Sequence, residues 1–100
     1  MKSTARAVVI GGGVVGVSTL YHLAKMGWSD VVLLERKELT SGSTWHAAGL
    51  LPLFNLSYSV GKLHQYSVGL YPTLEAETGL HAGFSQVTNI RLATTKDRMD

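Results

Sequence analysis

The sequence contains no cysteine, and this absence removes several classes of site at once. A disulfide framework, a thiolate zinc centre and a cysteine nucleophile all require that residue. Long apolar runs are missing too: none approaches the ~20 residues of a membrane-spanning helix, and too few residues precede the first apolar run for a signal or transit peptide. We therefore expect no membrane partner and, by default, a cytoplasmic location.

Charge is sparse and evenly spread. Only 16% of the residues are charged, the formal net charge is +2, and the nine lysines and arginines are distributed between Lys2 and Arg98 without a run. Such a distribution lacks the basic patch with which proteins bind nucleic acid, so we expect no nucleic-acid partner. Hydrophobic residues make up 45% of the 100 residues, which is typical of one soluble globular domain at most.

The first third of the chain has the pattern of a strand, a helix and a second strand. Residues 5–10 form a short apolar run that ends at a glycine, as buried parallel strands do. Residues 14–26 carry apolar side chains at helical spacing, and Gly27 stands where a left-handed residue ends a helix. Residues 31–34 predict a second buried strand, which a right-handed crossover would place parallel to and beside the first. The predicted fold class is α/β, with a Rossmann-like βαβ unit.

The rest of the chain is less regular. Residues 37–55 are rich in small residues and predict mostly loop with one helical turn. Residues 57–78 predict a second helix, which Pro72 should kink or divide. Alternating β-branched residues over 84–95 predict one long strand or a hairpin. Because no second parallel crossover follows, we interpret residues 1–100 as the N-terminal part of a larger oxidoreductase fold that binds FAD or NAD(P), with the remainder of the domain missing.

Three glycines form a G-x-G-x-x-G pattern between the first predicted strand and helix: Gly11, Gly13 and Gly16. In dinucleotide-binding folds the first permits a tight turn, the second leaves room for a pyrophosphate, and the third lets helix and strand pack closely. The helix N-terminus offers N–H groups to the phosphates, and Glu35, at the end of the second strand, can accept hydrogen bonds from a ribose. The alternative is glycines that serve only a tight turn; the strands, helix and acid in register favour a dinucleotide site.

The segment after Glu35 bears on the choice between NAD and FAD. A purely NAD-binding domain is expected to continue soon into another helix and strand. Here Arg36 is followed by a loop of glycine, serine, threonine and alanine that suits a large flat ligand. This difference favours FAD as the cofactor.

Five stretches of the chain resemble one known family: VVIGGGVVGVSTLYHLAKMGW, LLER, LTSGSTWHAAGL, LYPTLEAETG and NIRLATT. They resemble the dimethylglycine and sarcosine dehydrogenases, FAD-dependent amine oxidoreductases of the D-amino-acid-oxidase type. The resemblance implies oxidative demethylation of a small N-methylated amino acid, and it implies that His46 carries FAD covalently. It leaves open whether a folate-binding domain follows, which would make tetrahydrofolate a partner.

The resemblance also implies a set of cofactor-binding residues. Val14 and Val15 would lie at the pyrophosphate. The three glycines, Glu35 and Arg36 belong to the same set of cofactor-binding residues. The other residues implied to line the cofactor lie within residues 37–55, which are rich in small residues: Gly42, Ser43, Thr44, Trp45, Ala47, Ala48, Gly49 and Leu50. Trp45 could equally be a packing residue.

His46 has an alternative role without chemistry, because a lone histidine is more often a packed or surface residue. As a tether it would need to be neutral, and histidine is largely neutral near pH 7. His22, His64 and His81 have no ligand partners at suitable spacing, so we expect no metal site.

No catalytic residue is assigned within the chain; the general base is expected beyond residue 100. A non-catalytic regulatory protein, like the regulatory subunit of pyruvate dehydrogenase phosphatase, and an NAD-dependent dehydrogenase remain the competing functions.

Overall fold

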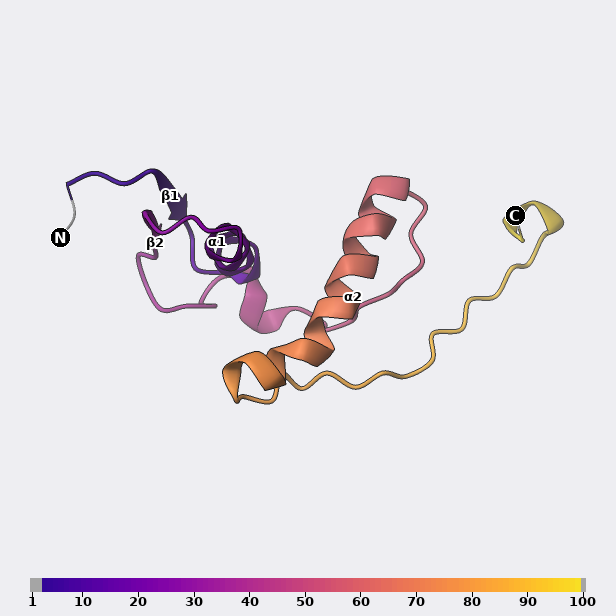
Figure 1. Cartoon of the computed structure of the whole chain (residues 1–100). Coiled ribbons are helices and arrows are strands. Elements are labelled where there is room, and N and C mark those ends of the chain that lie inside the picture. Colours follow the sequence, from indigo (N-terminus) through magenta and orange to yellow (C-terminus); the bar gives the residue numbers. More distant parts are fainter. Residues whose placement is uncertain (1–2, 100) are drawn as a thin grey trace. The chain divides into compact units, whose positions relative to one another are not determined.

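The structure, a computed structural model, describes residues 3–99. The chain divides between Ala48 and Gly49 into two units, which we describe separately. The first unit contains strand β1 (Ala7–Ile10), helix α1 (Val14–Lys25), strand β2 (Val31–Leu34) and a short 3-10 helix, η1 (Ser43–His46) (Figure 1).

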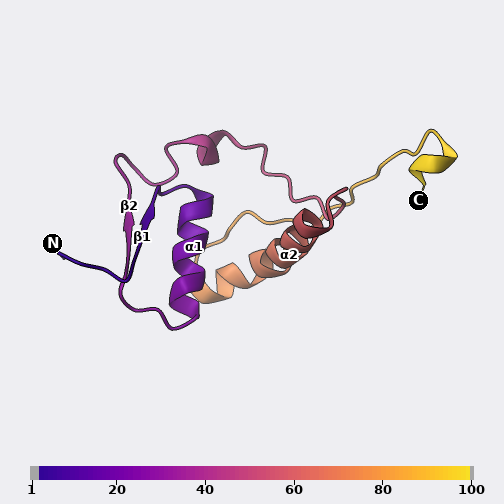
Figure 2. The ribbon, with the colours of Figure 1, turned by 90° about the horizontal axis from the view of Figure 1, so that it is seen from above.

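The two strands of the first unit form a parallel two-stranded sheet. Ala7 pairs with Val31 and Ile10 with Leu34 at the two ends of the register. The Gly11 N–H extends the ladder by donating to the Leu34 carbonyl oxygen at 2.8 Å. Helix α1 runs alongside both strands (Figure 2). The predicted strand–helix–strand order and the parallel pairing are confirmed, with the first strand beginning at Ala7.

Helix α1 ends in the left-handed turn that its sequence predicts. Gly27 has φ +91°, a conformation that glycine adopts at little cost. The Gly27 N–H donates to the Ala24 carbonyl and the Trp28 N–H to the Leu23 carbonyl, both at 3.0 Å. These two bonds make up a Schellman motif, which satisfies carbonyls that the helix end would leave unpaired. The turn redirects the chain toward β2.

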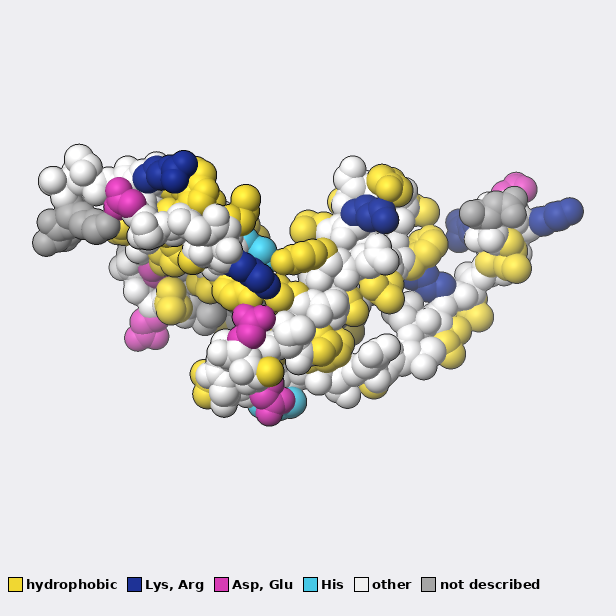
Figure 3. Space-filling view, viewed as in Figure 1, with side chains coloured by type: hydrophobic (Ala, Val, Ile, Leu, Met, Phe, Trp, Pro, Cys, Tyr) yellow, Lys and Arg dark blue, Asp and Glu magenta, His cyan; other side chains and the backbone are white. Residues whose placement is uncertain are grey.

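The sheet is less buried than its apolar sequence predicts. In β1, Val8 and Ile10 are 50% and 85% exposed, and Leu34 in β2 is 51% exposed. Hydrophobic side chains accordingly appear at the surface in Figure 3. A parallel sheet becomes buried only when other elements cover both of its faces. The described residues of this unit supply one covering helix, so the prediction of two buried strands is wrong for this chain.

The second unit contains helix α2 (Tyr58–Thr78) and the 3-10 helix η2 (Lys96–Arg98). Helix α2 continues through Pro72, which therefore does not divide it. Ser57 is the N-cap residue, but its side chain makes no capping bond; its N–H instead donates to Asn55 Oδ1 at 2.8 Å. Gly79 ends the helix with φ +73°. The prediction of a helix over 57–78 is confirmed to within one residue.

Residues 84–95 do not form the predicted strand or hairpin. Alternating β-branched residues favour an extended chain, but a strand exists only when its N–H and C=O groups pair with a neighbouring strand. The described part of the second unit contains no strand to pair with. Tyr71 of α2 does stack on Phe84, with ring centroids 6.0 Å apart, so packing fixes the start of this segment.

Across residues 3–99, no helix combines the length and the apolar character needed to cross a lipid bilayer.

Candidate functional site

The junction of β1 and α1 depends on two glycines, Gly11 in the turn and Gly16 in the first turn of the helix. Gly11 has φ +112°, which side-chain-bearing residues rarely adopt. A Cβ atom built on Gly16 would overlap the carbonyl oxygen of Gly11 and lie 3.4 Å from Val9 Cγ1. Helix and strand can therefore approach this closely only because residue 16 has no side chain. The role expected for Gly16 in helix–strand packing is the one the structure shows.

Gly12, which the glycine pattern leaves unassigned, is at the centre of the loop contacts. It is buried, and its carbonyl oxygen accepts a hydrogen bond from the Thr40 N–H at 2.9 Å. A Cβ atom on Gly12 would lie 2.7 Å from Leu39 Cδ2 and 3.1 Å from Glu35 Cβ. Thr40 itself has φ +66°, an unfavourable conformation for a β-branched residue. The segment after β2 therefore packs directly onto Gly12, and the run of three consecutive glycines was the signal for this contact.

The carboxylate of Glu35 is held by two backbone groups. Its Oε2 accepts the Gly12 N–H and its Oε1 accepts the Lys37 N–H, each at 2.8 Å. The hydrogen bond from Gly12 lowers the pKa of Glu35 most, followed by that from Lys37, while the Arg36 backbone and charge also lower it and partial burial opposes the shift. Each carboxylate oxygen can accept more than one hydrogen bond. Glu35 is thus held ionised at the end of β2 with capacity left for ligand hydroxyls.

This arrangement predicts a pH dependence for the stability of the loop. The pKa of Glu35 is lower in the folded chain than its ordinary value of 4.5, so the carboxylate contributes stability above about pH 4.5. That contribution should be lost as the pH falls through the lower, folded-state pKa. We expect Glu35→Gln to lower the melting temperature at pH 7 and to have less effect near pH 3, measured by scanning calorimetry. Equal melting-temperature differences at both pH values would contradict this role, and Glu38→Gln provides the matched control.

Thr44 connects the segment after β2 to the beginning of α1. Its Oγ1 accepts a hydrogen bond from the Val14 N–H at 2.9 Å, between residues 30 positions apart. A Cβ atom on Gly13 would lie 3.0 Å from that same oxygen. Gly13 therefore leaves room for the Thr44 hydroxyl. Gly13, Val14 and Thr44, three of the expected cofactor-binding residues, lie together at the N-terminus of α1.

His46 ends the short helix η1 and is exposed. Its ring lies beside that of Trp45, with centroids 4.7 Å apart and an interplanar angle of 57°. Trp45 is itself 71% exposed, so this contact is on the surface of the first unit. The imidazole of His46 is therefore exposed and lies on the same turn as Thr44.

The other expected site residues are less closely gathered. Val15 is 77% exposed on the first turn of α1, and Arg36, Gly42, Ser43, Ala47 and Ala48 are also exposed within the first unit. Gly49 and Leu50 belong to the second unit. The site of the first unit therefore ends at Ala48.

Two of the other histidines, His22 and His81, make local contacts. His22 Nδ1 lies 2.7 Å from the Ser18 carbonyl oxygen, one turn back along α1. His81 Nδ1 lies 3.1 Å from Glu75 Oε2, an exposed pair that the turn at Gly79 brings together and that sequence spacing did not suggest. Among residues 3–99, no three histidine, aspartate or glutamate side chains are grouped so that they could hold a metal ion.

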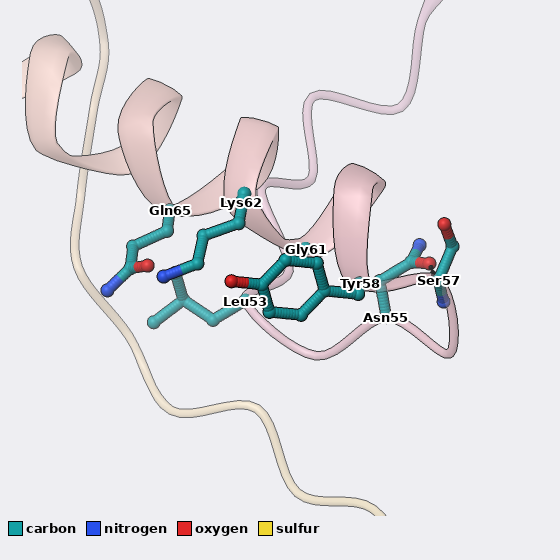
Figure 4. A pocket seen from close by; sticks show the side chains of 7 residues that line it. All are labelled: Leu53, Asn55, Ser57, Tyr58, Gly61, Lys62 and Gln65. Atoms are coloured by element: carbon teal, nitrogen blue, oxygen red, sulfur yellow. Dashed lines mark hydrogen bonds between the residues drawn. The ribbon is translucent and has the colours of Figure 1, made fainter.

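A separate hollow lies wholly within the second unit (Figure 4). Its volume is about 370 Å³, and its lining carries one ionisable cation, Lys62, and one phenol, Tyr58. The full lining is Leu53, Asn55, Ser57, Tyr58, Gly61, Lys62 and Gln65. It contains neither a carboxylate nor a histidine.

The first unit, in contrast, fits the adenosine diphosphate half of a dinucleotide. The N–H groups of a first helical turn attract phosphate, and at the start of α1 the Val14 N–H already donates to Thr44 Oγ1. Ionised Glu35 stands at the end of the neighbouring strand, where a ribose diol would need an acceptor.

Residues 6–100 match the protein family described as FAD dependent oxidoreductase. The chain belongs to that family. The cofactor of this family is FAD rather than NAD, in agreement with the prediction from the segment after Glu35. The predicted fold is confirmed. The crystal structure of glycine oxidase from Bacillus cereus ATCC 14579 matches with a TM-score of 0.72 and 28% identity, over 94% of this chain and 27% of that one.

Two relatives in this family are similar along almost the whole chain. It is 58% identical over 99 residues to the mitochondrial dimethylglycine dehydrogenase of Rattus norvegicus, covering 99% of this chain and 12% of that protein. It is 44% identical over 99 residues to the mitochondrial pyruvate dehydrogenase phosphatase regulatory subunit of Mus musculus, covering 99% of this chain and 11% of that protein. The chain therefore spans about an eighth of the length of such relatives or less.

Proposed function

We propose that the protein containing this chain is an FAD-dependent oxidoreductase acting on CH–NH groups, which oxidatively demethylates a small N-methylated amino acid such as dimethylglycine or sarcosine. The observation that carries the proposal is the 58% identity to dimethylglycine dehydrogenase over 99 residues that include the whole glycine loop and the His46 turn. Since the chain spans only 12% of that relative, the substrate stays a proposal for the complete protein.

The residues of this chain would bind and orient the cofactor. When bound, FAD accepts a hydride from the N-methyl carbon, and hydrolysis of the resulting iminium releases that carbon as formaldehyde. The first turn of α1 would hold the pyrophosphate and Glu35 the ribose. None of the described side chains is assigned to proton transfer with the amine.

We also infer that His46 carries the flavin covalently. Three features support the assignment: the imidazole is exposed, it lies on a turn that Thr44 joins to α1, and the WHAAG segment resembles that of flavin-carrying relatives. The remaining cofactor contacts proposed for residues 42–48 follow from the position of that turn. Those proposed for Gly49 and Leu50 rest on the resemblance alone.

The proposed activity is tested by mixing the oxidised full-length protein with candidate amines in the absence of oxygen. We expect dimethylglycine or sarcosine to bleach the flavin absorption band, because hydride transfer reduces the ring. Glycine, which lacks the N-methyl carbon, is the matched control and should leave the band unchanged. A flavin that dithionite reduces but that no secondary or tertiary amine reduces would contradict the proposal.

That contrary outcome would favour the second candidate, a non-catalytic regulatory protein. The 44% identity to a phosphatase regulatory subunit is the observation in its favour. The exposed His46 argues against it, because a protein without redox work has no evident need for a flavin attachment residue.

Two further assignments remain proposals. Tetrahydrofolate as a partner depends on a folate-binding domain outside this chain. A cytoplasmic location was the expectation from composition, whereas the two relatives are mitochondrial by name. Fractionation of cells that express the full-length protein separates the two compartments.

A further inference from the structure

We propose that Thr44 is a positioning residue for flavin attachment: its hydroxyl oxygen, bonded to the Val14 N–H, fixes the turn that carries His46 onto the N-terminus of α1. The inference rests on the proposed covalent link at His46 and adds a residue that acts through His46 and α1. It concerns the first unit alone.

The first step is the bond itself. Helix α1 begins at Val14, and its N-cap is Gly13, which has no side chain with which to cap the helix. The first N–H groups of a helix have no partner within the helix. Thr44 Oγ1 accepts the Val14 N–H at 2.9 Å and so performs the capping from another segment. Loss of a capping hydroxyl usually weakens a helix end measurably.

The second step connects this bond to His46. Thr44 and His46 belong to the same 3-10 turn, Ser43–His46, and the Ala47 N–H closes that turn on the Thr44 carbonyl oxygen at 3.4 Å. Anchoring Thr44 therefore fixes the backbone that carries His46. The neighbouring Trp45 ring, 4.7 Å away, further restricts the imidazole.

The third step is that attachment needs this restriction. Attachment would join the imidazole nitrogen to the methyl carbon of the flavin. That carbon and the imidazole would each lose a proton, and the flavin would take up two electrons, which molecular oxygen would then remove. The nitrogen must stay close to one carbon atom for this reaction, and holding reacting groups in place is a large contribution to such rates. A turn that is free to leave α1 would present the imidazole less often.

The test compares Thr44→Val and Thr44→Ser in the full-length protein. Valine keeps the shape but removes the acceptor, whereas serine keeps the acceptor. After adding FAD to the apoprotein, we expect acid-stable flavin to form roughly tenfold more slowly in Thr44→Val, from the usual size of one hydrogen bond, and near the wild-type rate in Thr44→Ser. Thr19→Val is the matched control, because the Thr19 hydroxyl donates to the Val15 carbonyl oxygen within α1 itself.

Two further measurements separate positioning from other roles. In the His46→Ala background, Thr44→Val should weaken FAD binding by a smaller factor than it slows attachment, because Thr44 is also one of the proposed cofactor contacts. An affinity loss as large as the rate loss would mean that Thr44 acts by binding FAD alone and would overturn the proposal. In the apoprotein, amide hydrogen exchange at Val14 should quicken in Thr44→Val. Unchanged exchange together with unchanged attachment would also overturn it, while leaving the proposed function intact. Absence of acid-stable flavin in the wild-type protein would instead refute the His46 link on which both depend.

Discussion

Gly16→Ala should leave the full-length protein almost without flavin. The added Cβ atom would overlap the carbonyl oxygen of Gly11, which is backbone and cannot move aside as a flexible side chain can. Relief requires α1 to shift away from β1, and the end of the helix that we propose to hold the pyrophosphate would shift with it. Overpacking of this kind typically costs ~1–3 kcal/mol of stability. The flavin content of purified protein, from the ratio of visible to ultraviolet absorbance, is the measurement.

Ser18→Ala is the control for Gly16→Ala. It places the same methyl group two positions along α1, at an exposed residue. We expect its flavin content and melting temperature to match those of the wild type. Normal flavin content in Gly16→Ala would show that helix and strand need not approach as closely as the structure has them.

His46→Ala should abolish acid-stable flavin completely. A covalent bond survives unfolding, whereas contacts with the glycine loop do not, so the wild-type pellet after acid precipitation should keep the flavin and the variant pellet should release it. The native variant should still bind FAD, because residues 11–16 and Glu35 are unchanged. Flavin fluorescence of the denatured protein on a gel provides the measurement.

His81→Ala serves as the control for this experiment, since it removes another exposed imidazole from a different part of the chain. It should retain acid-stable flavin. Fluorescent flavin on denatured His46→Ala protein would show that another residue forms the link.

Local patterns were enough to predict most of the fold. The boundaries of α1 and β2 agree with the sequence to within one residue, because apolar spacing and terminal glycines are properties of neighbouring residues. Residues 84–95 fail for the opposite reason: a strand needs a partner, and the pattern of one segment does not say whether a partner is present. The prediction that β1 is buried was wrong for a similar reason, since burial depends on what covers the sheet.

The site was predictable only in part. Spacing pointed to Gly16 and Glu35; Gly16 lets α1 and β1 pack closely, and the bonding of Glu35 to a ribose stays a prediction. Spacing could not reveal that Gly12 is bonded to both Glu35 and Thr40, or that Thr44 caps α1. Those contacts join segments far apart in sequence, and their geometry follows from the path of the chain after β2, where Thr40 adopts a left-handed conformation.

The open sheet of the first unit has a practical consequence for handling the protein. Its two strands, Ala7–Ile10 and Val31–Leu34, pair only with each other, so each also has an unpaired edge among the described residues. Unpaired edges that carry apolar side chains such as Ile10 promote association between chains. Chains that expose these strand edges are therefore expected to aggregate at the concentrations that spectroscopy requires.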